Sequence, residues 1–301
     1  MSAPTVEILN LFPFVATADF VRPVATNMPW NALPVCLLNW SMLLIGTVSL
    51  PLMKTSGGFF LHDRSLLHCL FHAVNSVISR MFFTMNKSKN FTPGFIMVLH
   101  TFGRDLKWNP HIHCLLSEGG FSDDGFWRHV KHFNYSYLRN AFRTALLNEM
   151  ESRIGPSFKK IKSKCYSDHK QGFYVYAKPN LCDPKTVVKY IGRYLGRPVI
   201  ATSRIDNYDG NTVTFHYNRH EDNKYIVETL PAIDFIKRLI RHIPEKHFKM
   251  IRYGGLYARH RKIDEKLYRA ISKSKHRFLP KSQPMANRHS FFFRLRSFRM
   301  S

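Results

Sequence analysis

The stretch "GFIMVLHTFGRDLKWNPHIHCLL", residues 94–116, contains two apolar runs separated by a polar segment, and this pattern determines the predicted fold. Residues 94–102 and 111–116 have the length and composition of β-strands, and the segment between them has the charge and proline content of a loop. Strands joined by such a short connection pair as antiparallel neighbours. We therefore predict an α+β fold with a central antiparallel sheet flanked by helices.

Two histidines, His111 and His113, stand two positions apart in the second predicted strand. Residues i and i+2 of a strand point to the same face, so both imidazoles can approach one point, while Ile112 and Cys114 pack on the other side. His100 on the preceding strand can supply a third ring. Three imidazoles with open coordination positions can hold zinc, copper, manganese or magnesium, and ligand type alone does not choose among them. The alternative is that these are hydrogen-bonded structural histidines.

The charge of the chain points to a polyanionic partner. Forty-five Lys and Arg residues against 20 Asp and Glu give a formal net charge of +25. Such a field attracts nucleic acid and is unusual for an enzyme of small metabolites, so we expect no small-molecule substrate. The charge is uneven, because residues 1–53 contain Arg22 as their one Lys or Arg.

A second candidate motif is "KYIGRYLGR", residues 189–197, in a predicted short helix over 182–198. Tyr190 and Tyr194 are four positions apart and therefore share one helical face. The basic residues interleaved with them are Lys189, Arg193 and Arg197. A tyrosine hydroxyl with a pKa of about 10 is a weak nucleophile, but cations nearby stabilise the phenolate as it attacks phosphorus. The alternative is a packed aromatic pair.

Hydrophobic periodicity predicts the remaining elements. The segment 63–85 reads as an amphipathic helix with Asp63 as its N-terminal cap, and Asp209-Gly210 reads as a hairpin turn. Two further helices are predicted over Phe126–Ile154 and 231–243. Further strands are predicted over 172–178, 199–205, 211–217 and 224–230.

Cysteine usage and the apolar N-terminal part bear on the compartment. The five cysteines form no CxxC pair, which argues against a zinc ribbon or a disulfide framework and fits a reducing cytosol. Residues 33–53 are uncharged and long enough to span a bilayer, but a core segment or a non-native leader is the preferred interpretation. We expect no membrane partner.

The two motifs together resemble those of a known family. His-hydrophobic-His on a strand, followed by a Tyr-x-x-x-Tyr helix in a basic chain, resembles the two-tyrosine HUH endonucleases, specifically the rolling-circle transposases of bacterial insertion sequences. The stretches "PGFIMVLHTFGRDLKWNPHIHCLLSEGGFSDDGFW" (93–127) and "VVKYIGRYLGRPVIATSRI" (187–205) are similar to blocks of that family, in its order. The resemblance covers residues 58–262 and implies an HUH-type core.

The resemblance also implies a mechanism and a partner. His111 and His113, with His100, would hold Mg²⁺ or Mn²⁺ against the scissile phosphate of single-stranded DNA at element ends and targets. Tyr190 or Tyr194 would then attack this phosphate to give a 5′-phosphotyrosine. The protein would act in the bacterial cytoplasm, at the nucleoid.

The ends of the chain depart from the family pattern, because its members begin with a cysteine-rich zinc-binding region. We interpret residues 1–57 as an atypical apolar leader, 58–262 as the catalytic core and 263–301 as a basic tail. Our hypothesis is that the chain is a truncated copy whose recognition of DNA ends is impaired.

Two other functions remain open at this point. One is a relaxase or rolling-circle replication initiator, and the other is a non-enzymatic nucleic-acid-binding protein whose aromatic residues stack on single strands.

Overall fold

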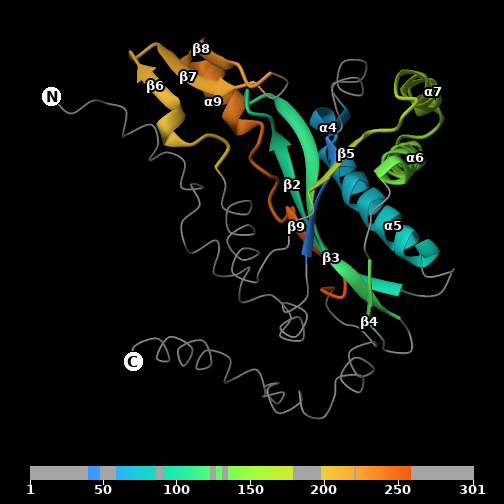
Figure 1. Cartoon of the computed structure of the whole chain (residues 1–301). Helices are drawn as coiled ribbons and strands as arrows, with labels where there is room; N and C mark the ends of the chain where they lie inside the picture. The colour runs from blue at the N-terminus through green and yellow to red at the C-terminus, as the bar shows by residue number, and fades with distance from the viewer. Residues whose placement is uncertain are drawn as a thin grey trace, which may run out of the picture.

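A computed structural model describes residues 40–47, 59–85, 91–122, 127–130, 135–178, 198–219 and 222–258. Within these ranges the chain forms an antiparallel sheet of six strands, a smaller antiparallel sheet of three strands, and helices (Figure 1). The fold is therefore α+β with a central antiparallel sheet, as predicted. The sequence motif of residues 189–197 and the predicted tail 263–301 lie outside the described residues.

The larger sheet is built around the predicted hairpin. Its strands are β1 (Trp40–Thr47), β2 (Phe91–Phe102), β3 (Trp108–Ser122), β4 (Trp127–His129), β5 (Tyr174–Lys178) and β9 (Ile251–Gly255). The order is β5-β1-β3-β2-β9, with β4 paired to the end of β3. Strand β1 lies inside the uncharged stretch 33–53 and pairs with β3 on one side and β5 on the other. These eight residues thus form an interior strand of the sheet.

Register fixes which side chains share a face of this sheet. His100 on β2 lies directly opposite His111 on β3, and Val98 lies opposite His113. Ile112 is fully buried, and so is its neighbour Cys114 on the same face, so both pack away from the histidines as predicted. A slip of one residue would exchange the two faces.

Helices cover one face of the main sheet (Figure 1), and Ile112 belongs to the core between them and the sheet. They are α4 (Phe59–His62), α5 (Leu67–Met85) and α6 (Tyr135–Ile154), and α7 (Lys159–Asp168) packs against α6. Asp63 caps a short 3-10 turn before α5 and accepts a hydrogen bond from the Ser65 amide at 2.9 Å, which confirms the predicted start. The stretch Arg64–Met85 is long and apolar enough to cross a membrane, but 61% of its window is buried inside the fold. Its apolar face is therefore explained by packing.

Two predicted elements were wrong in part. The helix predicted over Phe126–Ile154 begins at Tyr135, because Trp127–His129 forms strand β4 against the extended end of β3. The strand predicted over 199–205 is instead a 3-10 turn at Thr202–Arg204, and only Ile205 belongs to a strand. The reason lies in contacts with other segments, because the Arg204 side chain donates to the main-chain carbonyls of His216 and Arg104 and so holds the turn.

The smaller sheet contains β6 (Ile205–Tyr208), β7 (Thr212–Asn218) and β8 (Tyr225–Pro231), followed by α9 (Ala232–Ile240). The Asp209-Gly210 turn joins β6 and β7 as predicted, with Gly210 at φ 97°. The Asp209 carboxylate accepts hydrogen bonds from the amides of Asn211 and Thr212. Phe215 of β7 packs on Phe235 of α9 in a separate small core.

Candidate metal centre

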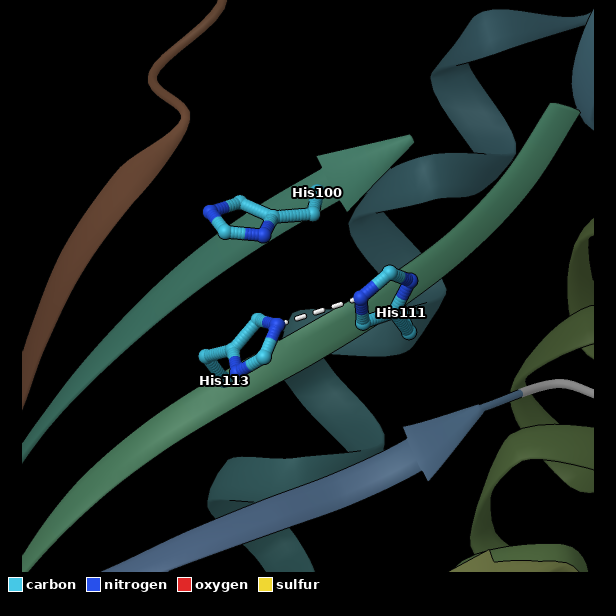
Figure 2. Close-up of side chains that lie close together, drawn as sticks. All are labelled: His100, His111 and His113. Carbon is cyan, nitrogen blue, oxygen red and sulfur yellow. Dashed lines mark hydrogen bonds between the residues drawn. The ribbon is translucent and has the colours of Figure 1, made fainter. Parts of the chain in front are cut away.

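Three histidines meet on the face of the main sheet opposite the helices. His100 comes from β2, while His111 and His113 come from β3. Figure 2 shows the three rings on one side of the two strands. The register explains this arrangement, because His100 and His111 are cross-strand partners and His113 follows at i+2. The structure therefore brings together the three histidines that the sequence singled out.

The spacing of the rings fits the ligands of one cation. Nε2 of His111 lies 3.1 Å from Nε2 of His113, and the His100 ring centroid lies 4.4 Å from that of His113. One nitrogen atom from each ring can be chosen so that all three lie within 4.8 Å of one another. Two nitrogens each about 2.1 Å from a single ion at a right angle would be about 3.0 Å apart. The pair on β3 already has this separation.

The surroundings prepare His111 to be a ligand. Its Nδ1 lies 2.7 Å from the carbonyl oxygen of Asn109, which can only accept, so Nδ1 carries the proton and Nε2 keeps its lone pair. A hydrogen bond of this kind to the far nitrogen is the usual support of a metal-bound histidine. His100 is 6% exposed and stacks on Phe102 at 5.5 Å, whereas His111 and His113 are half-buried. Two of the three rings thus face the solvent side, where an outer ligand could approach.

A buried histidine beside this centre, His242, forms a hydrogen-bonded bridge between Thr101 and Leu106. No pattern in the sequence identified it. Nε2 of His242 donates to the carbonyl of Leu106 at 2.9 Å, and Nδ1 accepts from the Thr101 hydroxyl at 3.1 Å. The ring also stacks on Trp108 at 5.8 Å. His242 therefore ties the end of β2, the β2–β3 turn and the start of β3 together. Burial lowers the pKa of His242 below its ordinary value, which favours the neutral ring that these two bonds require.

The Arg64 side chain packs on the outer side of the His242 contacts. The Arg64 guanidinium lies over the Trp108 ring at 5.6 Å and donates to the carbonyls of Arg241 and Ile243 at 3.1 and 2.7 Å. No sequence signal marks this contact, because Arg64 and Ile243 come from distant parts of the chain. The bridge holds the hairpin that carries the histidines.

The other predicted site residues lie outside the described residues. They are the two tyrosines, Tyr190 and Tyr194, and the predicted DNA-binding residues Lys189, Arg193 and Arg197.

The chain is similar to known transposases. A family model described as "Putative transposase" matches residues 94–264, a range that includes all three histidines. The transposase for insertion sequence element IS801 of Pseudomonas savastanoi pv. phaseolicola is 33% identical over 242 residues, which cover 76% of this chain and 56% of that protein. "Putative transposase y4qJ" of Sinorhizobium fredii (strain NBRC 101917 / NGR234) is 31% identical over 185 residues, or 54% of this chain and 45% of that protein.

The chain thus spans about half the length of these curated relatives. No solved structure matches it.

Proposed function

This chain belongs to the family described as "Putative transposase", and from that membership we propose that it nicks and rejoins single-stranded DNA at the ends of an insertion element. The observation that carries the proposal is the convergence of His100, His111 and His113 on one face of the hairpin. The net charge of +25 supports a polyanionic substrate. The proposed partner is therefore DNA. The proposed place of action is the bacterial cytoplasm, at the nucleoid.

The three histidines would hold a divalent cation, Mg²⁺ or Mn²⁺. When bound there, such an ion would polarise a phosphoryl oxygen of the scissile phosphate. Histidine donors of this kind also bind zinc, so the donor set alone does not select the metal. The hydrogen bond from His111 to the Asn109 carbonyl keeps its Nε2 available, and His100 is held by its stacking on Phe102.

The proposed nucleophile is Tyr190 or Tyr194. The phenolic oxygen attacks phosphorus and loses its proton, the bond between phosphorus and the 3′ oxygen of the upstream nucleotide breaks, and this leaving oxygen takes up a proton. The products are a 5′-phosphotyrosine and a free 3′-OH. The energy of the phosphodiester is kept in the new ester, so rejoining requires no ATP. The second tyrosine of the Tyr-x-x-x-Tyr motif would accept a second strand.

The test is a search for the covalent product. The full chain is incubated with Mg²⁺, Mn²⁺ or Zn²⁺ and single strands from the sequences that flank its reading frame. A label at the 3′ end follows the protein-bound fragment, and a label at the 5′ end follows the fragment with the free 3′-OH. We expect a denaturant-stable adduct that requires a divalent metal.

Variants make the assignment specific. The double change Tyr190→Phe with Tyr194→Phe should abolish the adduct, whereas Tyr225→Phe, a change at an exposed tyrosine of the smaller sheet, should leave it intact. Metal-dependent cleavage without any adduct would refute the phosphotyrosine mechanism. Strand binding without cleavage would favour the non-enzymatic alternative.

A further inference from the structure

One row of the main sheet places a tyrosine in line with the histidines. Tyr174 of β5 pairs with Thr47 of β1, and Thr47 pairs with His111 of β3. Since His111 in turn pairs with His100, the row runs across four strands. Directly opposite residues of antiparallel strands point to the same face. The Tyr174 side chain therefore lies on the histidine face of the sheet.

The neighbouring residue confirms this orientation. Val175 is 1% exposed and belongs to the core on the helix side, so Tyr174 must point the other way. Tyr174 is 40% exposed. Two strand spacings separate it from His111, which corresponds to about 10 Å between their Cα atoms. An exposed aromatic ring thus lies on the same face as the candidate metal centre, two strands away from His111.

A basic side chain borders this ring. The Arg139 guanidinium of α6 lies 5.9 Å from the centre of the Tyr174 ring, and its Nε donates to the Val175 carbonyl at 3.5 Å. The turn before β5 is fixed to α6 by a hydrogen bond from the Phe173 amide to the Arg139 carbonyl. The segment 159–170, which precedes β5 in the chain, contains five lysines, of which Lys162 is paired with Glu151. The Arg139 guanidinium beside the ring makes this end of β5 suited to a phosphate backbone.

We propose that Tyr174 stacks on an unpaired base of the DNA strand whose phosphate lies at the histidine cluster, and that Arg139 lies beside the strand's backbone. This inference rests on the proposed function and adds a binding position to it. Stacking on aromatic rings inside a basic groove is the general way in which proteins hold single strands.

Charge distinguishes Tyr174 from Tyr225, an exposed tyrosine of strand β8 that is 57% exposed. Tyr225 stacks on His216, whose Nδ1 contacts the Asp206 carboxylate at 2.7 Å. Further carboxylates of the same small sheet and its turns belong to Asp209, Asp222 and Glu228. Arg219 is paired with Asp222 and Arg238 with Glu228, and residues 202–231 contain three Lys or Arg against five Asp or Glu. This sheet therefore has no excess of positive charge to attract a phosphate backbone, so Tyr225 serves as the matched control.

The experiment compares two strands of equal length by fluorescence anisotropy, using the full chain with Mn²⁺. One strand is oligothymidylate, and the other carries abasic sites throughout and so offers backbone without bases. We expect Tyr174→Ala to weaken binding of oligothymidylate roughly ten-fold and to leave the abasic strand nearly unchanged. Tyr174→Phe should restore the native affinity, because it keeps the ring, and Tyr225→Ala should have no effect.

The outcomes separate this inference from the proposed function. Equal losses for both strands, no loss for either, or the same loss with Tyr225→Ala would overturn the stacking role. The DNA adduct is measured on the same preparations. Base-dependent loss without any adduct would defeat the phosphotyrosine mechanism alone, whereas an adduct without base-dependent loss would defeat the stacking role alone. Urea unfolding of Tyr174→Ala and Tyr174→Phe checks that both retain the fold.

Discussion

Thr101 donates its hydroxyl proton to Nδ1 of His242 across 3.1 Å, although the two residues are 141 positions apart in the chain. The bond is buried, and it fixes the strand residue next to His100 to the segment that follows α9. A mutation far from the histidine cluster can therefore disturb the strand that carries one of its members.

The stability of the protein should depend on the protonation of His242. Burial lowers the pKa of His242 in the folded chain, whereas in the unfolded chain its pKa is about 6.5. The unfolded state therefore binds the proton first, and the free energy of unfolding falls as the pH drops below about 6.5. His242→Gln removes this titration. We expect the variant to be less stable at neutral pH and to lose less stability between about pH 7 and 5.

Urea unfolding at stepped pH measures the effect, with His62→Gln, a change at an exposed histidine, as the control. Parallel stability curves for the native chain and His242→Gln would show that His242 does not titrate in this way.

Removal of one histidine of the cluster should weaken metal binding. His111→Ala and His113→Ala each take away a nitrogen of the closest pair, so we expect Mn²⁺ affinity to fall by at least about ten-fold in isothermal titration calorimetry. His216→Ala should bind Mn²⁺ as the native chain does. If the two cluster variants kept native affinity and lost only thermal stability, the histidines would be structural.

Two glycines at positive φ should differ in their tolerance of alanine. Gly210, at φ 97°, has open space around a built Cβ, so Gly210→Ala carries only backbone strain of about 1 kcal/mol. Gly172, at φ 85°, would in addition bring its Cβ against the Arg139 backbone. We expect Gly172→Ala to lower the free energy of unfolding clearly more than Gly210→Ala in urea titrations. Equal effects would mean that the turn before β5 is not packed on α6.

The buried thiols should resist labelling in the folded chain. Burial raises the pKa of Cys69 and of Cys165 to about 11, and it raises that of Cys114 as well. At pH 8 the reactive thiolate is therefore scarce as well as covered. In a background of Cys36→Ser and Cys182→Ser, a disulfide reagent should label three thiols in urea and none rapidly without it. Rapid labelling of the folded chain would contradict the packing of α5, β3 and α7.

The histidine cluster could be predicted because its determinants are local. His111 and His113 are two positions apart on a strand, and His100 lies on the other strand of the same hairpin, so alternation and a short turn were sufficient. Helix α5 was equally clear, since it has a cap and a regular apolar stripe. Patterns within one segment of sequence carry this information.

The remaining features depend on contacts between distant segments. Strand β9 is only five residues long and contains two glycines, and its partner β2 lies far upstream. No local sequence pattern therefore predicts β9. Helix α7 was missed because its lysines leave it without a continuous apolar stripe. The uncharged run around Leu44 was ambiguous, and its strand is defined by pairing with β3 and β5. His242 gave no sign of its place beside the cluster.

The compact placement of the three histidines in one hairpin bears on the order of events when the chain folds. The β2–β3 pairing closes a small loop, whereas β9 joins β2 from about 150 residues later in the chain, and closing a longer loop costs more entropy. Contacts between neighbouring segments generally form faster than such distant ones. We therefore expect the nascent chain to assemble its histidine cluster while much of the C-terminal half is still being synthesised.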